Sequence, residues 1–217
     1  MEILFEDRDI VVCVKPSGTL SEGTGESCMP ALLARRCSDG ADVLTVHRLD
    51  RETAGVMVFA KNQAAAAALS ESIRGGLMKK QYLAAVHGVP TLSADTLDDF
   101  LFFDRARTKS FIVDRPRKGV KRALLDYRVL DSRDGLSLLA VDLHTGRTHQ
   151  IRAQLSHRRL PIVGDRRYGA PKNEAGAFGL LALSLSFPHP TTGKPLNFRI
   201  QMPDGYPWDI FELTEQE

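Results

Sequence analysis

Strand-like segments joined by short turns dominate the second half of this 217-residue chain and restrict its fold more than any other feature. Arg122–Leu130 and Leu136–Leu143 flank an Asp-Gly dipeptide, which is one of the strongest local signals for a β-hairpin. Phe178–Phe187 and Pro195–Met202 flank a second turn, PHPTTGK. Hairpins pair strands in antiparallel order. The sequence therefore predicts an α+β fold with a mainly antiparallel or mixed β-sheet core flanked by a few helices.

Shorter patterns predict the remaining elements, which all fall within one expected domain over residues 1–217. Helices are expected from Asn62, a favourable cap, to Arg74, which precedes two glycines, and over Thr148–His157. Ser17–Asp42 and Thr91–Lys121 are less patterned and are expected to form loops. Further strands are expected at Ile3–Phe5, Ile10–Val14, Leu44–Val46, Gly55–Ala60 and Gln81–Val86.

Basic residues cluster along the chain although the net charge is only +2. The segment from Arg105 to Arg122 holds eight basic residues and one acid, and the segment from His144 to Arg167 holds six arginines and one aspartate. Such clusters suit a polyanion, because lysine and arginine neutralise phosphates and release counterions. Solvated loop and helix faces are the alternative explanation.

No membrane segment is expected, since no stretch approaches the roughly 20 apolar residues that a spanning helix requires. The first residues, MEILFEDRD, carry charges where a signal peptide needs an apolar core, so a cytoplasmic protein is expected. The chain also lacks G-x-G-x-x-G and G-x-x-x-x-G-K-[ST] motifs. The sequence thus gives no support for a dinucleotide or P-loop nucleotide cofactor.

Two polar segments are candidates for chemistry. VHRLDRETAGVMVFAK places Asp50 beside cations in a loop before an apolar strand, where nearby positive charge favours an ionised carboxylate. A structural cluster of ion pairs would give the same pattern, and spacing alone does not separate the two. HTGRTHQIRAQLSHRRLPIVGDRRYGA presents Arg147, His149, Gln150 and Arg152 around the start of a helix. No metal is expected, because no carboxylate or cysteine completes a ligand set around these histidines.

Several of these motifs resemble one family. HRLDRETAG resembles the H-R-L-D-x-x-T-S-G signature of the RluA-type pseudouridine synthases. TGRTHQIR followed by PIVGDRRYG resembles the later motif of that family, KKQYLAAVHG resembles its lysine-x-tyrosine strand, and LFEDRDIVVCVKPSG resembles its entry into the catalytic domain. The resemblance runs from about Leu4 to Trp208.

The resemblance implies roles for individual residues. Asp50 matches the catalytic aspartate, Tyr82 matches the tyrosine that stacks on the target base, and Arg152 matches the basic residue that pairs with the aspartate. A second group matches positions that contact RNA or support the pocket: Arg48, Arg147, His149 and Gln150. Arg48 would help to fill the gap left by the extruded nucleotide. The segment from Arg105 to Arg122 is a candidate RNA clamp, with a solvated β-hairpin as the alternative.

The implied activity is the isomerisation of selected uridines in ribosomal or transfer RNA to pseudouridine, by a monomer that needs no cofactor. The nucleophilic carboxylate would attack either ribose C1′ or base C6, and the sequence leaves both open. Two departures from the family pattern stand out: Ala54 replaces the usual serine, and Leu181-Ala182-Leu183 replaces a leucine-histidine-alanine pattern. The small S4-type RNA-binding domain of several relatives is not expected here.

Two other functions compete with the synthase. A non-catalytic RNA-binding module would keep the basic segments but has no use for Asp50, Tyr82 and Arg152 together. A glycosidase-type hydrolase would pair Asp50 with Glu52, and retaining glycosidases need carboxyl groups about 5 Å apart on opposite sides of the bond. Two carboxylates from one short loop fit that arrangement poorly.

Overall fold

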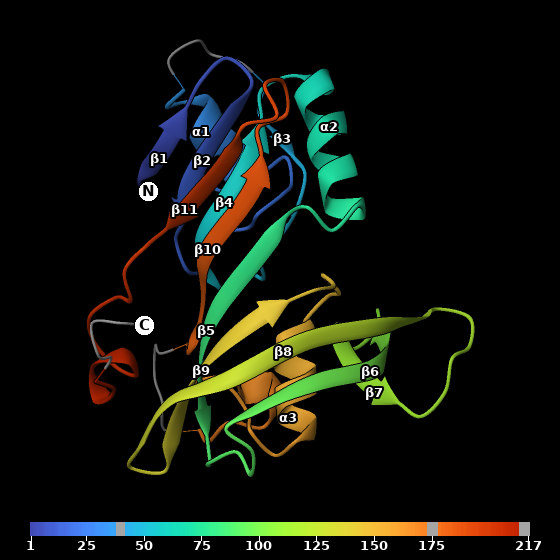
Figure 1. The fold of residues 1–217 in the computed structure, drawn as a ribbon, viewed down its shortest axis with the longest axis vertical. Helices are drawn as coiled ribbons and strands as arrows, with labels where there is room; N and C mark the ends of the chain where they lie inside the picture. Colours follow the sequence, from blue (N-terminus) through green and yellow to red (C-terminus); the bar gives the residue numbers. More distant parts are fainter. Residues whose placement is uncertain (38–41, 173–177, 213–217) are drawn as a thin grey trace. The chain divides into compact units, whose positions relative to one another are not determined.

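A computed structural model describes residues 1–37, 42–172 and 178–212 (Figure 1). The chain divides into two compact units: unit 1 comprises Met1–Lys80 with Ala182–Gln201, and unit 2 comprises Gln81–Leu181 with Met202–Glu217. Strands outnumber helices in the described part of both, which confirms the predicted α+β class. The expectation of a single domain over residues 1–217 stays a prediction.

Unit 1 is built on antiparallel strands with one long helix beside them (Figure 1). β1 pairs with β2, β2 with β4, β3 with β4, and β10 with β11. The elements are β1 (Ile3–Glu6), β2 (Ile10–Lys15), α1 (Met29–Ala34), β3 (Leu44–Thr45), β4 (Ala54–Ala60), α2 (Gln63–Arg74), β10 (Leu180–Pro188, in unit 1 from Ala182) and β11 (Pro195–Arg199).

The core of unit 1 lies between these strands and α2. Alternate residues of β2, β4 and β10 point inward, and Ala65 and Leu69 of α2 pack against them. As predicted, Asn62 caps this helix: its side-chain oxygen accepts a hydrogen bond of 2.8 Å from the Ala65 N–H. The strand residues of the cluster are Ile10, Val12, Val56, Val58, Ala60, Leu185 and Phe187.

Unit 2 is an antiparallel ladder in the order β5-β9-β8-β6-β7, against which one helix packs (Figure 1). α3 contacts β6 and β7, and Ala153 of α3 joins Leu101, Ala123 and Tyr168 in a buried cluster. The elements are β5 (Lys79–His87, in unit 2 from Gln81), β6 (Ala94–Asp104), β7 (Lys109–Val113), β8 (Val120–Arg133), β9 (Leu136–Leu143), α3 (Gln150–His157) and two 3-10 turns, η1 (Arg166–Tyr168) and η2 (Trp208–Ile210).

The hairpin predicted at the Asp-Gly dipeptide is confirmed as β8 and β9. Asp134 and Gly135 have φ angles of 52° and 75°, as the type I′ turn of a two-residue hairpin requires. β8 is longer than predicted, since it runs from Val120 to Arg133. The hairpin of β10 and β11 is also confirmed, with β10 starting two residues later than expected, at Leu180.

The prediction of a loop over Thr91–Lys121 is wrong, because this segment contains the β6–β7 hairpin and the start of β8. Four aspartates in β6 obscured its alternation, in which Leu97 and Leu101 are buried on one face. Strand pairing on both sides supplies the hydrogen bonds that such a polar strand needs. The loop expected over Ser17–Asp42 likewise contains α1, and residues 38–41 lie outside the described residues.

The predicted helix over Thr148–His157 begins two residues later, at Gln150. His149 has a φ of 54°, which is a left-handed conformation that ends regular helix geometry at that residue. His149 is therefore the residue before the helix, and its side chain leaves the backbone in a direction that a helical residue would not have.

Among the described glycines of unit 1, Gly55 leaves the least room for a β-carbon. A β-carbon built on this residue would lie 2.2 Å from the carbonyl oxygen of Ala182, and its φ is 127°. Only glycine combines this backbone conformation with such a contact. Gly55 therefore allows β4 to begin directly after the polar loop.

Replacement of Gly55 by alanine is expected to lower the free energy of unfolding by about 3 kcal/mol, because the added methyl group overlaps the Ala182 backbone. Gly193→Ala is the matched control, since Gly193 also has positive φ (68°) but has no atom within 4 Å of its β-carbon position. Urea denaturation of both variants measures the difference. Equal losses would contradict a steric role for Gly55.

Candidate active site

The loop that carries Asp50 connects β3 to β4 in unit 1 and is held by a buried lysine. The Lys15 side chain is fully buried. Its Nζ donates three hydrogen bonds, to the carbonyl oxygens of Pro16 (2.9 Å), Thr19 (2.8 Å) and Arg51 (3.0 Å). An ammonium group has three donors, so all of them are used. One side chain thus ties the segment after β2 to the loop of Asp50.

Burial lowers the pKa of Lys15 to about 8, and the nearby Glu52 and Asp50 carboxylates act in the opposite direction. Desolvation disfavours the ammonium form, whereas negative neighbours and carbonyl acceptors favour it. Lys15 is therefore a cation kept close to the Asp50 loop. The sequence analysis did not single out this residue, because a lysine at the end of a strand usually reaches solvent.

Further hydrogen bonds fix the same loop. Ser21 Oγ donates to the Leu49 carbonyl (2.8 Å) and accepts from the Leu49 N–H (3.0 Å). The Gly18 N–H donates to the Arg51 carbonyl at 2.8 Å, and Arg51 Nε donates back to the Gly18 carbonyl at 3.0 Å. Asp50 itself is partly buried, and its carbonyl accepts from the Thr53 N–H at 3.1 Å. The backbone on both sides of Asp50 is therefore restrained.

Two other residues of the HRLDRETAG motif, His47 and Arg48, differ in exposure. His47 is buried, and its Nε2 accepts a hydrogen bond from the Val58 N–H at 3.1 Å. Desolvation, with a smaller contribution from Lys80, lowers the pKa of His47 well below its ordinary value, so its ring is neutral. Arg48 is exposed and pairs with Glu22. His47 thus holds the loop against β4, and Arg48 lies at the surface.

Arg152 in unit 2 forms a buried, bidentate ion pair with Asp165. The sequence motifs did not predict this partner. Its Nε and Nη2 donate to the two carboxylate oxygens of Asp165 at 2.6 and 2.9 Å. The guanidinium carbon also lies 5.1 Å from the ring centre of Tyr168 and 5.3 Å from that of Phe178. Planar pairing and aromatic neighbours fix the orientation of an arginine that a lysine could not replace.

Tyr168 extends this network to the residues around His149. The Tyr168 hydroxyl accepts a hydrogen bond from the Ser110 N–H at 2.7 Å and lies 3.1 Å from His149 Nδ1. Lys109 Nζ lies 4.8 Å from the centre of the Tyr168 ring. The network therefore links β7, η1 and the residue before α3.

The other predicted residues of unit 2 have different surroundings. Gln150 is buried: its amide oxygen accepts from Thr145 Oγ1 (2.7 Å) and the Arg147 N–H (3.1 Å), and its nitrogen donates to the Leu124 carbonyl (3.1 Å). These contacts suit support of the local backbone. Arg147 is exposed, and its Nε donates to the Arg122 carbonyl at 3.0 Å. Tyr82 lies in β5 opposite Val141 of β9 and is 6% exposed.

The described residues place the predicted site residues in two groups. Arg48 and Asp50 share one loop of unit 1, whereas Tyr82, Arg147, His149, Gln150 and Arg152 belong to unit 2. The pairing of Asp50 with Arg152 stays a prediction. Within residues 1–37, 42–172 and 178–212, no group of three or more His, Cys, Asp or Glu side chains is arranged to hold a metal ion, and no helix is long and apolar enough to cross a bilayer.

Comparison with solved structures defines the class of protein first. The structure entitled Human RNA Pseudouridylate Synthase Domain Containing 4 matches with a TM-score of 0.76 and 28% identity, over 93% of this chain and 88% of that chain. The class is therefore the pseudouridylate synthase fold. A family model described as RNA pseudouridylate synthase matches residues 9–157. The chain belongs to this family.

Relatives in sequence agree with this assignment. The uncharacterized RNA pseudouridine synthase MG209 of Mycoplasma genitalium is 33% identical over 202 residues, which are 91% of this chain and 65% of that protein. The uncharacterized RNA pseudouridine synthase YjbO of Bacillus subtilis is 32% identical over 230 residues, covering 100% of this chain and 76% of the relative. The chain thus spans just under two thirds of the length of MG209 and about three quarters of YjbO.

The Asp165–Arg152 pair is expected to stabilise unit 2 much more than an exposed pair of the same geometry. Asp165→Asn leaves a buried cation without its counter-charge and should lower the free energy of unfolding by about 3 kcal/mol. Asp98→Asn is the control, because Asp98 also accepts two hydrogen bonds from one arginine, Arg122, but both side chains are largely exposed.

Asp98→Asn should lower the free energy of unfolding far less, because solvent screens exposed ion pairs. Urea denaturation at pH 7 compares the two variants. Similar losses in both would show that burial does not make the Arg152 pair special.

Proposed function

We propose that this protein isomerises specific uridines in ribosomal or transfer RNA to pseudouridine, with Asp50 as its essential carboxylate. The observation that carries the proposal is the HRLDRETAG loop, which lies inside the region matched by the family model and whose backbone is anchored by Lys15 and Ser21. A carboxylate that acts as a nucleophile must be held in one orientation, and these anchors support that requirement.

The reaction breaks the bond between uracil N1 and ribose C1′ and forms a bond between C5 and C1′. The hydrogen on C5 leaves as a proton, and N1 takes up a proton, so that the product is an isomer of the substrate. A carboxylate can act as the nucleophile at C1′ or at base C6, and both routes start from the same side chain. After bond formation at C5, the proton passes to a base, for which Tyr82 or the released Asp50 carboxylate serves.

Arg152 and Tyr82 complete the proposed catalytic set. Arg152 orients Asp50 and offsets the burial of its charge, and its own orientation is supported by Asp165 and the two aromatic rings beside it. Tyr82 stacks on the target base. These assignments follow the motif match residue by residue, and the rigid surroundings of Arg152 agree with a positioning role.

RNA binding requires that the target nucleotide leave its stack, because its reactive atoms are inaccessible within a helix. We assign Arg48 to the space that the extruded nucleotide vacates, and Arg147 to the RNA backbone. His149 and Gln150 support the surrounding loop, consistent with their contacts to Tyr168 and Leu124. We further propose that the enzyme acts in the cytoplasm, as a monomer.

The activity is tested with RNA that carries tritium at uridine C5, which is released as pseudouridine forms. Asp50→Asn is expected to reduce label release by about a thousandfold or more, as loss of a nucleophile does. Glu52→Gln is the matched control, since Glu52 is an exposed carboxylate in the same loop. It should retain most of the wild-type rate.

The same experiment separates the alternatives. A glycosidase would need both carboxylates and would free uracil from the RNA, whereas the synthase keeps the base attached. A binding module would release no label with either variant or with the wild type. Equal rates for Asp50→Asn and the wild type would exclude Asp50 as the essential carboxylate.

The clamp proposed for Arg105 to Arg122 rests on exposed cations of the turn after β6, the turn after β7 and β8. Lys118→Ala in this segment is expected to lower the slope of log affinity against log salt by about 0.7, the value for one phosphate contact on single-stranded RNA. Lys194→Ala, in the turn between β10 and β11, is the matched control and should leave the slope unchanged. Fluorescence anisotropy with a uridine-containing single-stranded RNA measures both, and an unchanged slope for Lys118→Ala would contradict the clamp.

A further inference from the structure

The turn between β7 and β8, residues 114–119, carries three exposed basic residues: Arg115, Arg117 and Lys118. Arg122, Arg133 and Arg158 are each paired with acidic side chains. Among the described residues, Arg115 and Lys118 make no hydrogen bond or ion pair, and the guanidinium carbon of Arg117 lies 5.5 Å from the centre of the Phe102 ring. Positive charge in this turn is therefore available to an external anion.

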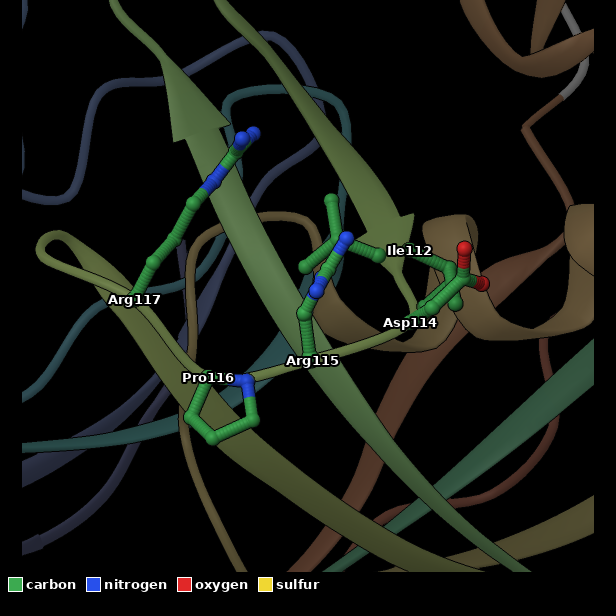
Figure 2. A pocket seen from close by; sticks show the side chains of 6 residues that line it. Ile112, Asp114, Arg115, Pro116 and Arg117 are labelled. Carbon is green, nitrogen blue, oxygen red and sulfur yellow. The ribbon is translucent and has the colours of Figure 1, made fainter.

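A pocket lies at this turn, entirely within unit 2. Its volume is about 530 Å³, and its lining comprises Ile112, Val113, Asp114, Arg115, Pro116 and Arg117. Figure 2 shows the side chains of Arg115 and Arg117 leaving the turn in the same direction, with Asp114 on the other side of Arg115. The six lining residues are consecutive in the chain, so this hollow presents a single turn to an external ligand.

Asp114 supplies the one carboxylate among the residues that line this pocket. It is exposed, and no described residue donates a hydrogen bond to its carboxylate or pairs with it. A phosphate is repelled by this carboxylate, whereas a base edge with N–H donors is attracted to it. Guanine presents two adjacent donors, N1–H and N2–H, which match the two oxygens of a carboxylate. Adenine, cytosine and uracil each present a donor beside an acceptor.

We propose that the β7–β8 turn is a subsite for a guanine base of the RNA, outside the catalytic residues. Asp114 accepts hydrogen bonds from guanine N1–H and N2–H, while Arg115 and Arg117 contact the adjoining phosphates, and Pro116 and Ile112 provide apolar surface for the base. Unpaired bases of single-stranded RNA expose the edge that this contact needs. The inference rests on the proposed function only in that the substrate is RNA.

The test uses RNA without uridine, so that binding does not depend on the synthase reaction. The probes are two single-stranded RNAs of ten nucleotides, adenosine throughout except for guanosine or inosine at the fifth position. Inosine lacks the N2 amino group and therefore loses one donor. The wild-type protein is expected to bind the guanosine RNA about tenfold more tightly than the inosine RNA, as measured by fluorescence anisotropy.

Asp114→Asn should abolish this preference, because an amide cannot accept both hydrogen bonds. Asp134→Asn is the matched control: it removes one negative charge from a different exposed turn of unit 2, between β8 and β9, and should keep the preference. Both substitutions raise overall affinity for a polyanion, so the ratio between the two RNAs is the deciding quantity. Arg115→Ala should weaken the binding of both RNAs by the same factor.

Equal binding of the two RNAs by the wild type, or a preference unchanged by Asp114→Asn, would overturn the subsite. Tritium release from uridine-labelled RNA is measured separately on the same preparations. Guanosine preference without label release would leave the subsite standing and remove the synthase proposal, whereas label release without preference would do the reverse.

Discussion

The buried ammonium group of Lys15 is the interaction on which the candidate catalytic loop depends. A fully buried charge is tolerated only when its hydrogen-bonding capacity is used, and the three donors of Lys15 are satisfied by backbone carbonyls from the segment after β2 and from the Asp50 loop. If these two segments moved apart, the buried ammonium group would lose hydrogen-bond acceptors, which is energetically costly. The geometry of the Asp50 loop therefore depends on the packing of unit 1.

In unit 2, too, a buried charge requires a partner, and burial separates arginines that are fixed in place from arginines that are open to solvent. Arg152 is 4% exposed and its charge is matched by Asp165, so its orientation is fixed. Arg122 and Arg158 form ion pairs that are open to solvent to differing degrees. Arg115 and Lys118 have no acidic partner in the described part of the chain. Charges that order the protein are therefore separated from charges that remain available to an external anion.

Elements with strong local signals were predictable from sequence. The Asp-Gly hairpin, the capped helix α2 and the β10–β11 hairpin each depend on residues a few positions apart, whose preferences act before tertiary contacts form. β6 was not predictable, because its aspartates weaken the strand pattern and its pairing with β7 and β8 is what makes it a strand. The start of α3 was misplaced because the left-handed conformation of His149 is stabilised by contacts outside the helix.

Sequence by itself determined the family, the α+β class and the identity of the candidate residues, because ordered motifs and turn signals survive without coordinates. Only the tertiary structure decided which groups those residues contact. Lys15 and Asp165 became recognisable as positioning residues once their partners, 36 and 13 positions away in the chain, were seen beside them. The physical reason is burial. The free energy of a charge depends on its access to solvent and on partners that are distant in sequence, and local sequence patterns reveal neither.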